Sequence, residues 1–528
     1  MPLVTVIASE PRRARPESGK NVTQRSNPRG WEWVAVALLI GLAITLSFHA
    51  WSSPVTWTPD GFYYEAQARE IAGQDASAAR RDVFFRDHSR VAAGFSRSDD
   101  LNTITYSAPF YRRRWAVPVI AAALHPVLGD RSILSVSLAS YALLGGAMFL
   151  LLRRRFSLAA SACAAAAVLV FKPVLHWASF PLTDIPGLLM LTLAMLAAWL
   201  ALTRGRRWVA VWVVAVLALA FTRDTAYIPA AAVCWVAIRQ RTKRALALAL
   251  SGIAAASSAP LLFPAPLRKE MAGAFSGGNV PSDDSWAFII HRYGRFMRLM
   301  LTEDFRDPPS ATLTLVLVLF IALLVLPTPA RRAIAIGRRA LLAGTLTVLT
   351  LVLVGWRIPG PDLGLYPKSK LGEDLPYPPS TRLTLLLALA VVLLLTRTPS
   401  GSVAATGRKT VLAGSLALFT VVLLGLTPPG YTLYLEPGFV VLLGIALLML
   451  PRRRNDAFFT LLRAGACAAL FFLALLPGPT DFRYELVLVP FAAVGFAAAL
   501  ERIPQLAVVG TVPRRAGRSA ASLVASIR

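Results

Sequence analysis

The sequence predicts an all-α protein that crosses a membrane many times. Hydrophobic residues make up 56% of its 528 residues, and the mean hydropathy is +0.58. Apolar runs of roughly 15 to 22 residues recur along the chain, close to the length at which a helix crosses the hydrocarbon core of a bilayer. Because lipid offers the backbone no hydrogen-bond partners, such runs fold as helices. We expect a polytopic bundle of about 12–14 transmembrane helices with external loops and interfacial helices.

The distribution of basic residues predicts the orientation of these helices. The net charge is +27, from 55 Lys and Arg against 28 Asp and Glu. These cations occur in short bursts between apolar runs, as they do in cytoplasmic loops of membrane proteins. The pattern therefore argues against a nucleic-acid partner and favours membrane lipids as the surroundings. We expect a multi-pass protein of the plasma membrane with both termini in the cytoplasm.

The first part of the chain is predicted to hold a large external loop. Residues 1–30 are polar and basic and form a cytoplasmic tail, and the apolar run 31–51 follows without a signal-peptide cleavage site. The segment 52–131 is then external. Its apolar stretch 115–128 is interpreted as an interfacial helix on the outer face, because counting it as a span would move the arginines at 153–155 outside.

The remaining spans alternate between basic clusters on one side and acidic loops on the other. Residues 208–221 and 227–238 are short for spans and meet at an outer turn, so the count is 12 if this pair is re-entrant and 14 otherwise. The full set of further spans is 132–152, 158–175, 185–202, 208–221, 227–238, 245–263, 312–326, and three more pairs that end with 486–500. In domain terms, we expect a catalytic transmembrane module at 31–263, an external loop at 264–310, C-terminal helices at 311–501 and a cytoplasmic tail at 502–528.

This orientation places ten acidic residues of the loops and turns at the outer face. They are Asp60, Asp184, Asp224, Asp283, Asp284, Asp362, Glu373, Asp374, Glu436 and Asp481. Loops that are held on a rigid helical scaffold commonly carry binding and catalytic groups. The sequence therefore predicts that the chemistry takes place on the extracytoplasmic side.

Asp60 and Asp184 are the candidate catalytic residues. Asp60 follows the first span closely, and Asp184 begins a later span between Pro181 and Pro186. Both lie at the ends of early helices on the same side, so they could approach each other. A pair of carboxylates suits a general base that deprotonates a hydroxyl, or a site for a divalent cation. The alternative is that each carboxylate only caps the start of a helix.

The segment around Asp60 resembles a motif of the GT-C superfamily of integral-membrane glycosyltransferases. It reads Asp60-Gly61-Phe62-Tyr63-Tyr64 and continues into an alanine-containing helix. In that superfamily an acidic residue in the first external loop, followed by aromatic residues, is the catalytic base. Residues 111–118, which combine Tyr, Arg and Pro, are similar to the surface helix that precedes the family's second span.

Two later segments are similar to the same superfamily. Pro181-Leu182-Thr183-Asp184 resembles a second acidic residue between the third and fourth spans, and residues 481–490 resemble a late Arg-Tyr pair before a proline-containing last helix. The resemblance covers about 31–263 and the final span. It implies a GT-C-like helical bundle with a polyprenyl-phosphate-linked sugar as the donor. Because Gly61 follows Asp60 where a second acid would pair with it, no cofactor is certain and a divalent cation (Mg or Mn) stays an open alternative.

Arginines and tyrosines near these segments are the candidate substrate-binding residues. A lipid-linked phosphate needs cations, and the planar fork of arginine matches phosphate oxygens. The candidate cations are Arg223, Arg292 and Arg483, and the candidate aromatic contacts are Tyr63, Tyr64 and Tyr484. The alternative is that the arginines anchor helices at the headgroup region or pair with the neighbouring Asp224 and Asp481.

These observations predict a membrane glycosyltransferase of hexosyl or pentosyl groups. It would move the sugar to a hydroxyl of a glycan, lipid or protein acceptor and invert the anomeric centre, with Asp60 as the general base. Two alternatives remain open, a polysaccharide polymerase or ligase and a transporter or flippase of lipid-linked substrates. The chain shows no internal repeat and few ionisable residues at helix centres, which disfavours a transporter.

Overall fold

A computed structural model of the chain describes residues 29–85, 101–205, 207–275, 280–281, 283–302, 456–475 and 482–501. Within these ranges the regular structure is helical and no β-strand occurs. This agrees with the predicted all-α class. Residues 1–28 of the expected tail 1–30, the expected tail 502–528 and the expected spans between 303 and 455 lie outside the described residues, and residues 29 and 30 already belong to the first helix.

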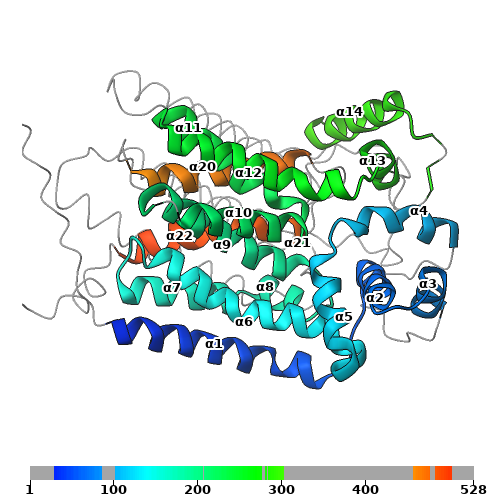
Figure 1. The fold of residues 1–528 in the computed structure, drawn as a ribbon, viewed down its shortest axis with the longest axis horizontal. Helices are drawn as coiled ribbons and strands as arrows, with labels where there is room; N and C mark the ends of the chain where they lie inside the picture. The colour runs from blue at the N-terminus through cyan, green and yellow to red at the C-terminus, as the bar shows by residue number, and fades with distance from the viewer. Residues whose placement is uncertain are drawn as a thin grey trace, which may run out of the picture.

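A bundle of long apolar helices forms the body of the molecule (Figure 1). Its helices are α1 (Arg29–Ser52), α6 (Ser132–Leu152), α7 (Leu158–Val170), α9 (Asp184–Thr203), α10 (Arg207–Ala220), α11 (Tyr227–Gln240) and α12 (Lys243–Leu262). Helix α9 is central, since it packs against both α6 and α10 and most of its residues are buried. Apart from the C-terminal end of α7, these boundaries follow the predicted apolar runs closely.

Two C-terminal helices are inserted into this bundle. Helix α20 (Ala457–Leu475) packs against α11, and α22 (Val489–Leu500) packs against α7. The short helix α21 (Phe482–Glu485) precedes α22 and contacts the region after α7. The end of the chain is thereby brought next to its first half.

Among the residues that the structure describes, four apolar segments are long enough to cross a membrane. They are Gly30–Ser52, Ala116–Leu152, Asp184–Thr203 and Lys243–Leu262. Large apolar side chains of α1 stay exposed, among them Trp33 at 68% and Phe48 at 65%. An apolar helix that exposes such side chains is expected where lipid surrounds it. Helices α10 and α11 have 14 residues each, so each is about 21 Å long and shorter than a bilayer core.

Six further helices gather at the end of the bundle where α1 finishes, on the right of Figure 1; we call this the α2 end. They are α2 (Pro59–Ile71), α3 (Ala76–Phe85), α4 (Leu101–Arg112), α5 (Ala116–Leu128), α13 (Leu267–Phe275) and α14 (Trp286–Thr302). Both predicted external loops, 52–131 and 264–310, contribute to this group. The described parts of the two loops are therefore at the same end of the bundle.

Helix α5 runs across the ends of α1 and α6 and not alongside them (Figure 1). Although residues 116–152 form one continuous apolar stretch, the chain turns through a short 3-10 segment at Gly129–Arg131, where Gly129 has φ +53°. A positive φ is readily adopted by glycine. The helix predicted at 115–128 is thus separate from the following span.

The predicted span 158–175 is wrong at its C-terminal end. Helix α7 stops at Val170, Phe171 is extended, and α8 (Lys172–Ala178) begins anew. The reason is Pro173, because proline lacks an amide hydrogen and its ring clashes with the carbonyl of the preceding turn. The break leaves residues 179–183 as a loop that leads into α9.

Candidate functional site

Helix α2 presents Asp60 in its first turn. Thr58 is the N-cap, and its hydroxyl accepts a hydrogen bond from the Gly61 amide at 3.3 Å. Asp60 is therefore not the capping residue, contrary to the simpler alternative. Its carboxylate is free to interact with other parts of the chain.

Asp184 also lies in the first turn of its helix, α9. It is the first residue of the helix, and the preceding Thr183 occupies the N-cap position without a side-chain capping bond. The Asp184 side chain is only 1% exposed. Gly187, one turn later, leaves room for Arg223, because a Cβ added at Gly187 would lie 3.1 Å from the Cβ of Arg223. The carboxylate is directed toward arginines.

Gly61 sets the close approach between α2 and the loop before α9. A Cβ at this position would lie 3.2 Å from the carbonyl oxygen of Pro181 and 3.3 Å from the ring of Trp57. Only a hydrogen fits there without a shift of the neighbours. This contact places the first turn of α2 beside the start of α9, which brings Asp60 near Asp184.

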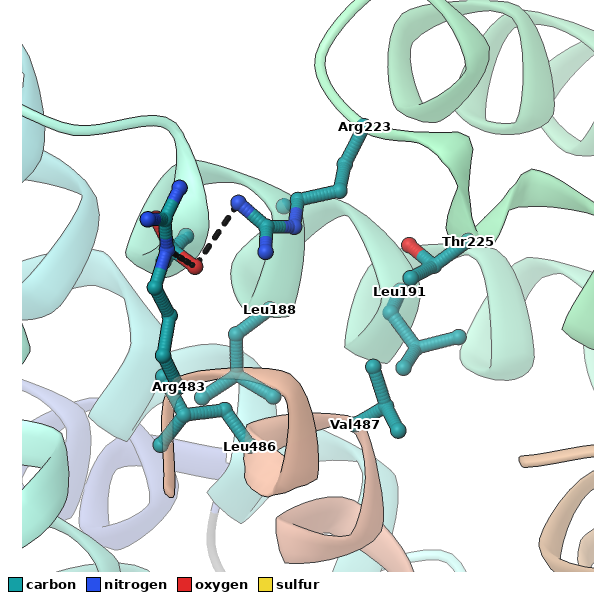
Figure 2. Close-up of a pocket in the computed structure, with 9 residues that line it drawn as sticks. Leu188, Leu191, Arg223, Thr225, Arg483, Leu486 and Val487 are labelled. Carbon is teal, nitrogen blue, oxygen red and sulfur yellow. Dashed lines mark hydrogen bonds and ion pairs between the residues drawn. The ribbon is translucent and has the colours of Figure 1, made fainter. Parts of the chain in front are cut away.

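Arg483 bridges the two carboxylates, and Arg223 pairs with one of them, Asp184. Arg483 donates from Nη2 to Oδ2 of Asp60, and from Nε to Oδ1 of Asp184 at 2.9 Å. Nη1 of Arg223 lies 2.7 Å from the same Oδ1 of Asp184. Figure 2 shows Arg223 and Arg483 reaching into one pocket from different segments, the turn after α10 and the C-terminal region. Residues separated by 299 positions in the sequence thus form one charge cluster.

The cluster is closed in this structure. The side chains of both arginines are 8% exposed, while that of Asp60 is 19% exposed. A cavity of about 10 Å³ adjoins Asp184, with leucine and valine side chains as its apolar wall, and this volume is enough for one water molecule. A ligand as large as a monosaccharide does not fit into this cavity.

Tyr111 is a site residue that the sequence did not reveal. Its hydroxyl donates to Oδ1 of Asp60 at 2.7 Å, and its ring stacks on Tyr63 with the centroids 4.3 Å apart and the planes 3° from parallel. The residue lies in the last turn of α4, directly before the arginine triplet 112–114. The sequence pattern identified this segment only as the beginning of a surface helix.

Aromatic rings support the two guanidinium groups. Cζ of Arg483 lies 5.9 Å from the centroid of Trp177 and 5.8 Å from that of Tyr484, and Cζ of Arg223 lies 5.6 Å from Tyr484. Cations placed over aromatic faces are attracted by the ring quadrupole. Tyr484 therefore belongs to the cluster, as a support for the arginines.

A second polar network lies behind Asp60. Nη1 of Arg114 donates to the hydroxyl of Tyr64 at 3.1 Å, and Thr183 donates to the same hydroxyl at 3.1 Å. The Nε of Arg114 also donates to Asp224 at 3.0 Å, and Asp224 pairs with Arg113 at 2.7 Å. Arg223 pairs with Asp184, whereas its neighbour Asp224 is held by Arg113 and Arg114.

Charge and burial act in opposite directions on Asp60. Burial disfavours its ionised form, but the positive charge of Arg483 and the hydrogen bond from Tyr111 outweigh burial, so the pKa of Asp60 is lowered. Burial, together with the negative charge of Asp60, raises the pKa of Tyr111 well above its ordinary value. At neutral pH the site thus contains an ionised Asp60 with a neutral tyrosine donating to it.

The other predicted residues fall in different places. Tyr63 stacks on Tyr111, and burial raises its pKa to about 12. Tyr64 is fully buried in the second network. Arg292 lies in α14 with its guanidinium over Phe288 at 5.2 Å, and the contacts of the charge cluster do not include it.

The part of the chain that the structure describes contains no group of three or more His, Cys, Asp or Glu side chains arranged to hold a metal ion. Asp60 and Asp184 are bridged by the guanidinium of Arg483, which stands where a shared cation would have to bind. The residues present therefore fit an arginine bridge better than a divalent ion. No protein-family model matches the chain, and no curated protein matches it significantly.

Proposed function

We propose that this protein is a membrane glycosyltransferase that moves a sugar from a polyprenyl-phosphate donor to an acceptor hydroxyl. The observation that carries the proposal is the convergence of Asp60, Asp184, Arg223 and Arg483 in one cluster at the α2 end of an apolar helical bundle. Such a cluster combines a carboxylate that can take a proton with cations that can bind phosphate. Both functions are needed in this reaction.

Asp60 is the general base of the proposed mechanism. The acceptor oxygen attacks the anomeric carbon while its proton passes to Asp60, and a new C–O bond forms. The bond between the anomeric carbon and the phosphate oxygen breaks, and its electron pair leaves with the polyprenyl phosphate. Attack opposite to the leaving group inverts the anomeric centre.

Exposure distinguishes the roles of the two carboxylates. Asp60 is 19% exposed, whereas Asp184 is 1% exposed and is held by both arginines. A base must come within hydrogen-bond reach of the proton that it removes, which favours Asp60. Asp184 instead orients the guanidinium groups.

Arg223 and Arg483 are the proposed phosphate-binding residues. Guanidinium groups bind phosphate oxygens through paired, charge-assisted hydrogen bonds. Their positions are set by Asp184 and by the rings of Trp177 and Tyr484. The sugar would then lie between this phosphate and the Asp60 carboxylate, as an in-line transfer requires.

The energetic cost of the cluster supports a functional role. Burial of ionised groups costs several kcal/mol per ion, and ion pairing often only offsets this penalty. Apolar residues of similar volume would stabilise such a bundle at least equally well. Perturbed, buried charges of this kind are concentrated at functional sites.

The location of the cluster bears on the alternative functions. Transporters usually bind their substrates near the middle of the membrane, between repeated halves. Here the cluster lies at the end of the bundle, next to the helices built from the two long polar loops (Figure 1). A polymerase or ligase would use the same lipid-linked donor, and the nature of the acceptor distinguishes it from a simple transferase.

The test is sugar transfer in isolated membranes that contain the full chain. Radiolabelled polyprenyl-phosphate sugars are supplied, and label in the acceptor fraction is measured for wild type and for Asp60→Asn. Positioned base catalysis contributes about 10²–10⁴-fold, so Asp60→Asn should lose at least 100-fold in rate. Glu70→Gln is the control, because Glu70 lies on the same helix and only forms a 3.3 Å surface ion pair with Arg112. Wild-type transfer by Asp60→Asn would refute the proposal.

A further inference from the structure

The guanidinium of Arg483 has three partners in the proposed reaction, the two carboxylates and the donor phosphate. In the closed site its guanidinium binds Asp60 through Nη2 and Asp184 through Nε. A donor phosphate needs the same guanidinium. A base that is paired with arginine is also a weaker proton acceptor, since the nearby positive charge stabilises its ionised form.

We propose that Arg483 is an exchangeable latch, whose Nη2 moves from Asp60 to the donor phosphate and so frees the Asp60 carboxylate for the acceptor. This inference rests on the proposed function and specifies how its site is activated. Asp60 is restrained while no donor is bound, and the arrival of the phosphate releases it. The donor therefore binds before the acceptor.

The contacts of Arg483 indicate which bond exchanges. The bond to Asp184 is buried, and Asp184 is also fixed by Arg223, whose own side chain packs against Gly187. Trp177 and Tyr484 hold the plane of the guanidinium. The bond to Asp60 is different, because it connects α2 with the C-terminal segment and includes the most exposed of the four charged side chains.

Asp60 remains in place after the exchange because Tyr111 holds its other oxygen. The Tyr111 hydroxyl donates to Oδ1, and its ring is fixed by the stack on Tyr63. The charged and titratable groups that act on Asp60 are Arg483, Tyr111, Arg114 and Tyr63. Of these, Arg483 alone shares its guanidinium with the proposed phosphate site.

The latch predicts that phosphate and Asp60 compete. The purified full chain in phosphatidylcholine nanodiscs is titrated with polyprenyl monophosphate, and the dissociation constant is measured for wild type and for Asp60→Asn. A charge-assisted hydrogen bond contributes roughly 1.5–3 kcal/mol, so loss of the competing carboxylate should tighten binding about tenfold or more. The same titration with polyprenol measures binding of the lipid tail without the phosphate charge. Titration with inorganic phosphate measures binding of the headgroup alone.

Asp224→Asn is the matched control. It also removes one negative charge from the α2 end, but Asp224 pairs with Arg113 and Arg114 and not with Arg483. Its affinity for polyprenyl monophosphate should change much less than that of Asp60→Asn. Equal gains in the two variants would indicate a general charge effect and would overturn the latch.

Other outcomes separate the latch from the proposed function. If wild type binds polyprenyl monophosphate and Asp60→Asn binds it no more tightly, the latch is wrong and the transferase proposal stands. If wild type does not bind this lipid at all, the proposed donor is wrong. Asp60→Ala also removes the competing carboxylate and serves as the second variant if Asp60→Asn does not fold.

Discussion

The two carboxyl oxygens of Asp60 have different partners. Oδ2 accepts from Arg483, and Oδ1 accepts from the hydroxyl of Tyr111. Both contacts stabilise the ionised carboxylate and lower its pKa, against the effect of burial. A general base works in its ionised form, so its activity is present above this pKa and is lost as the pH falls through it.

The substitution Tyr111→Phe should move the acid side of the pH–rate profile to higher pH. The ring and its stack on Tyr63 are kept, but the hydrogen bond to the ionised carboxylate is lost and the pKa of Asp60 rises. A hydrogen bond of about 1.5 kcal/mol corresponds to about one pH unit. The measurement is the rate of sugar transfer as a function of pH. Tyr106→Phe is the control, because Tyr106 lies on the same helix and donates to the carbonyl of Lys269 at 2.5 Å; equal shifts in the two variants would contradict this role of Tyr111.

Arg223→Gln should weaken the use of donor more than it reduces the amount of folded protein. Loss of the proposed phosphate contact should raise the apparent KM for the lipid donor by more than about tenfold, at a typical 1.5–3 kcal/mol per bond. Arg483 still pairs with Asp184 in this variant, so the buried carboxylate keeps one cation. Donor titrations are compared with the yield of monodisperse protein. An unchanged KM would exclude Arg223 from the phosphate site.

Two glycine contacts position the elements that carry the site. Gly61 allows α2 to approach the loop that contains Pro181, and Gly187 allows Arg223 to lie against α9. Neither glycine has a chemical role of its own. Their importance comes from the distance between packed elements, which a single methyl group changes.

We therefore expect Gly61→Ala to reduce transfer while the protein stays folded. Alanine favours the helix by up to about 1 kcal/mol over glycine, but its Cβ would meet the Pro181 carbonyl at 3.2 Å. The contact pushes α2 away from α9 and separates Asp60 from its partners. Transfer rate and thermal unfolding are measured together. Gly41→Ala in α1 is the control, since nothing lies within 4 Å of its Cβ, and a fully active Gly61→Ala would show that this contact does not set the site.

The whole molecule has two chemically different ends. The charge cluster and the short polar helices lie at the α2 end (Figure 1). The arginine triplet that follows α6 lies at the opposite end of the bundle and forms ion pairs there. Arg153 lies 3.0 Å from Glu32, and Arg155 lies 2.7 Å from Asp456. If basic clusters stay in the cytoplasm, the α2 end faces outward.

Cysteine labelling tests this orientation. In a chain whose three native cysteines are replaced by alanine, Ser77→Cys in α3 and Thr203→Cys at the end of α9 each provide one exposed thiol. An impermeant thiol reagent added to intact cells should label Ser77→Cys only, and Thr203→Cys should react after permeabilisation. Labelling of both from the same side would show that the predicted topology is wrong.

The sequence alone determined the class of the protein and the position of most described helices. Apolar runs report directly on burial in lipid or in a helical core, so the predicted spans at 31–51, 132–152 and 185–202 agree closely with α1, α6 and α9. Asp60 and Asp184 stood out because both were predicted at the ends of early helices on the same side, Asp60 before two tyrosines and Asp184 between two prolines. The proline break after α7 was also visible in the sequence, although the predicted span did not take it into account.

Only the tertiary structure decided which groups meet. Arg483 contacts a carboxylate 299 positions away because α20 and α22 insert into the first half of the bundle, and no local pattern encodes such packing. The same holds for Tyr111, whose hydroxyl reaches Asp60 across two helices, and for Arg292, which lies in α14 away from the cluster's contacts. Periodicity and charge bursts depend on neighbours in the sequence, whereas a site depends on distances between elements, and at Gly61 those distances are set by the absence of one methyl group.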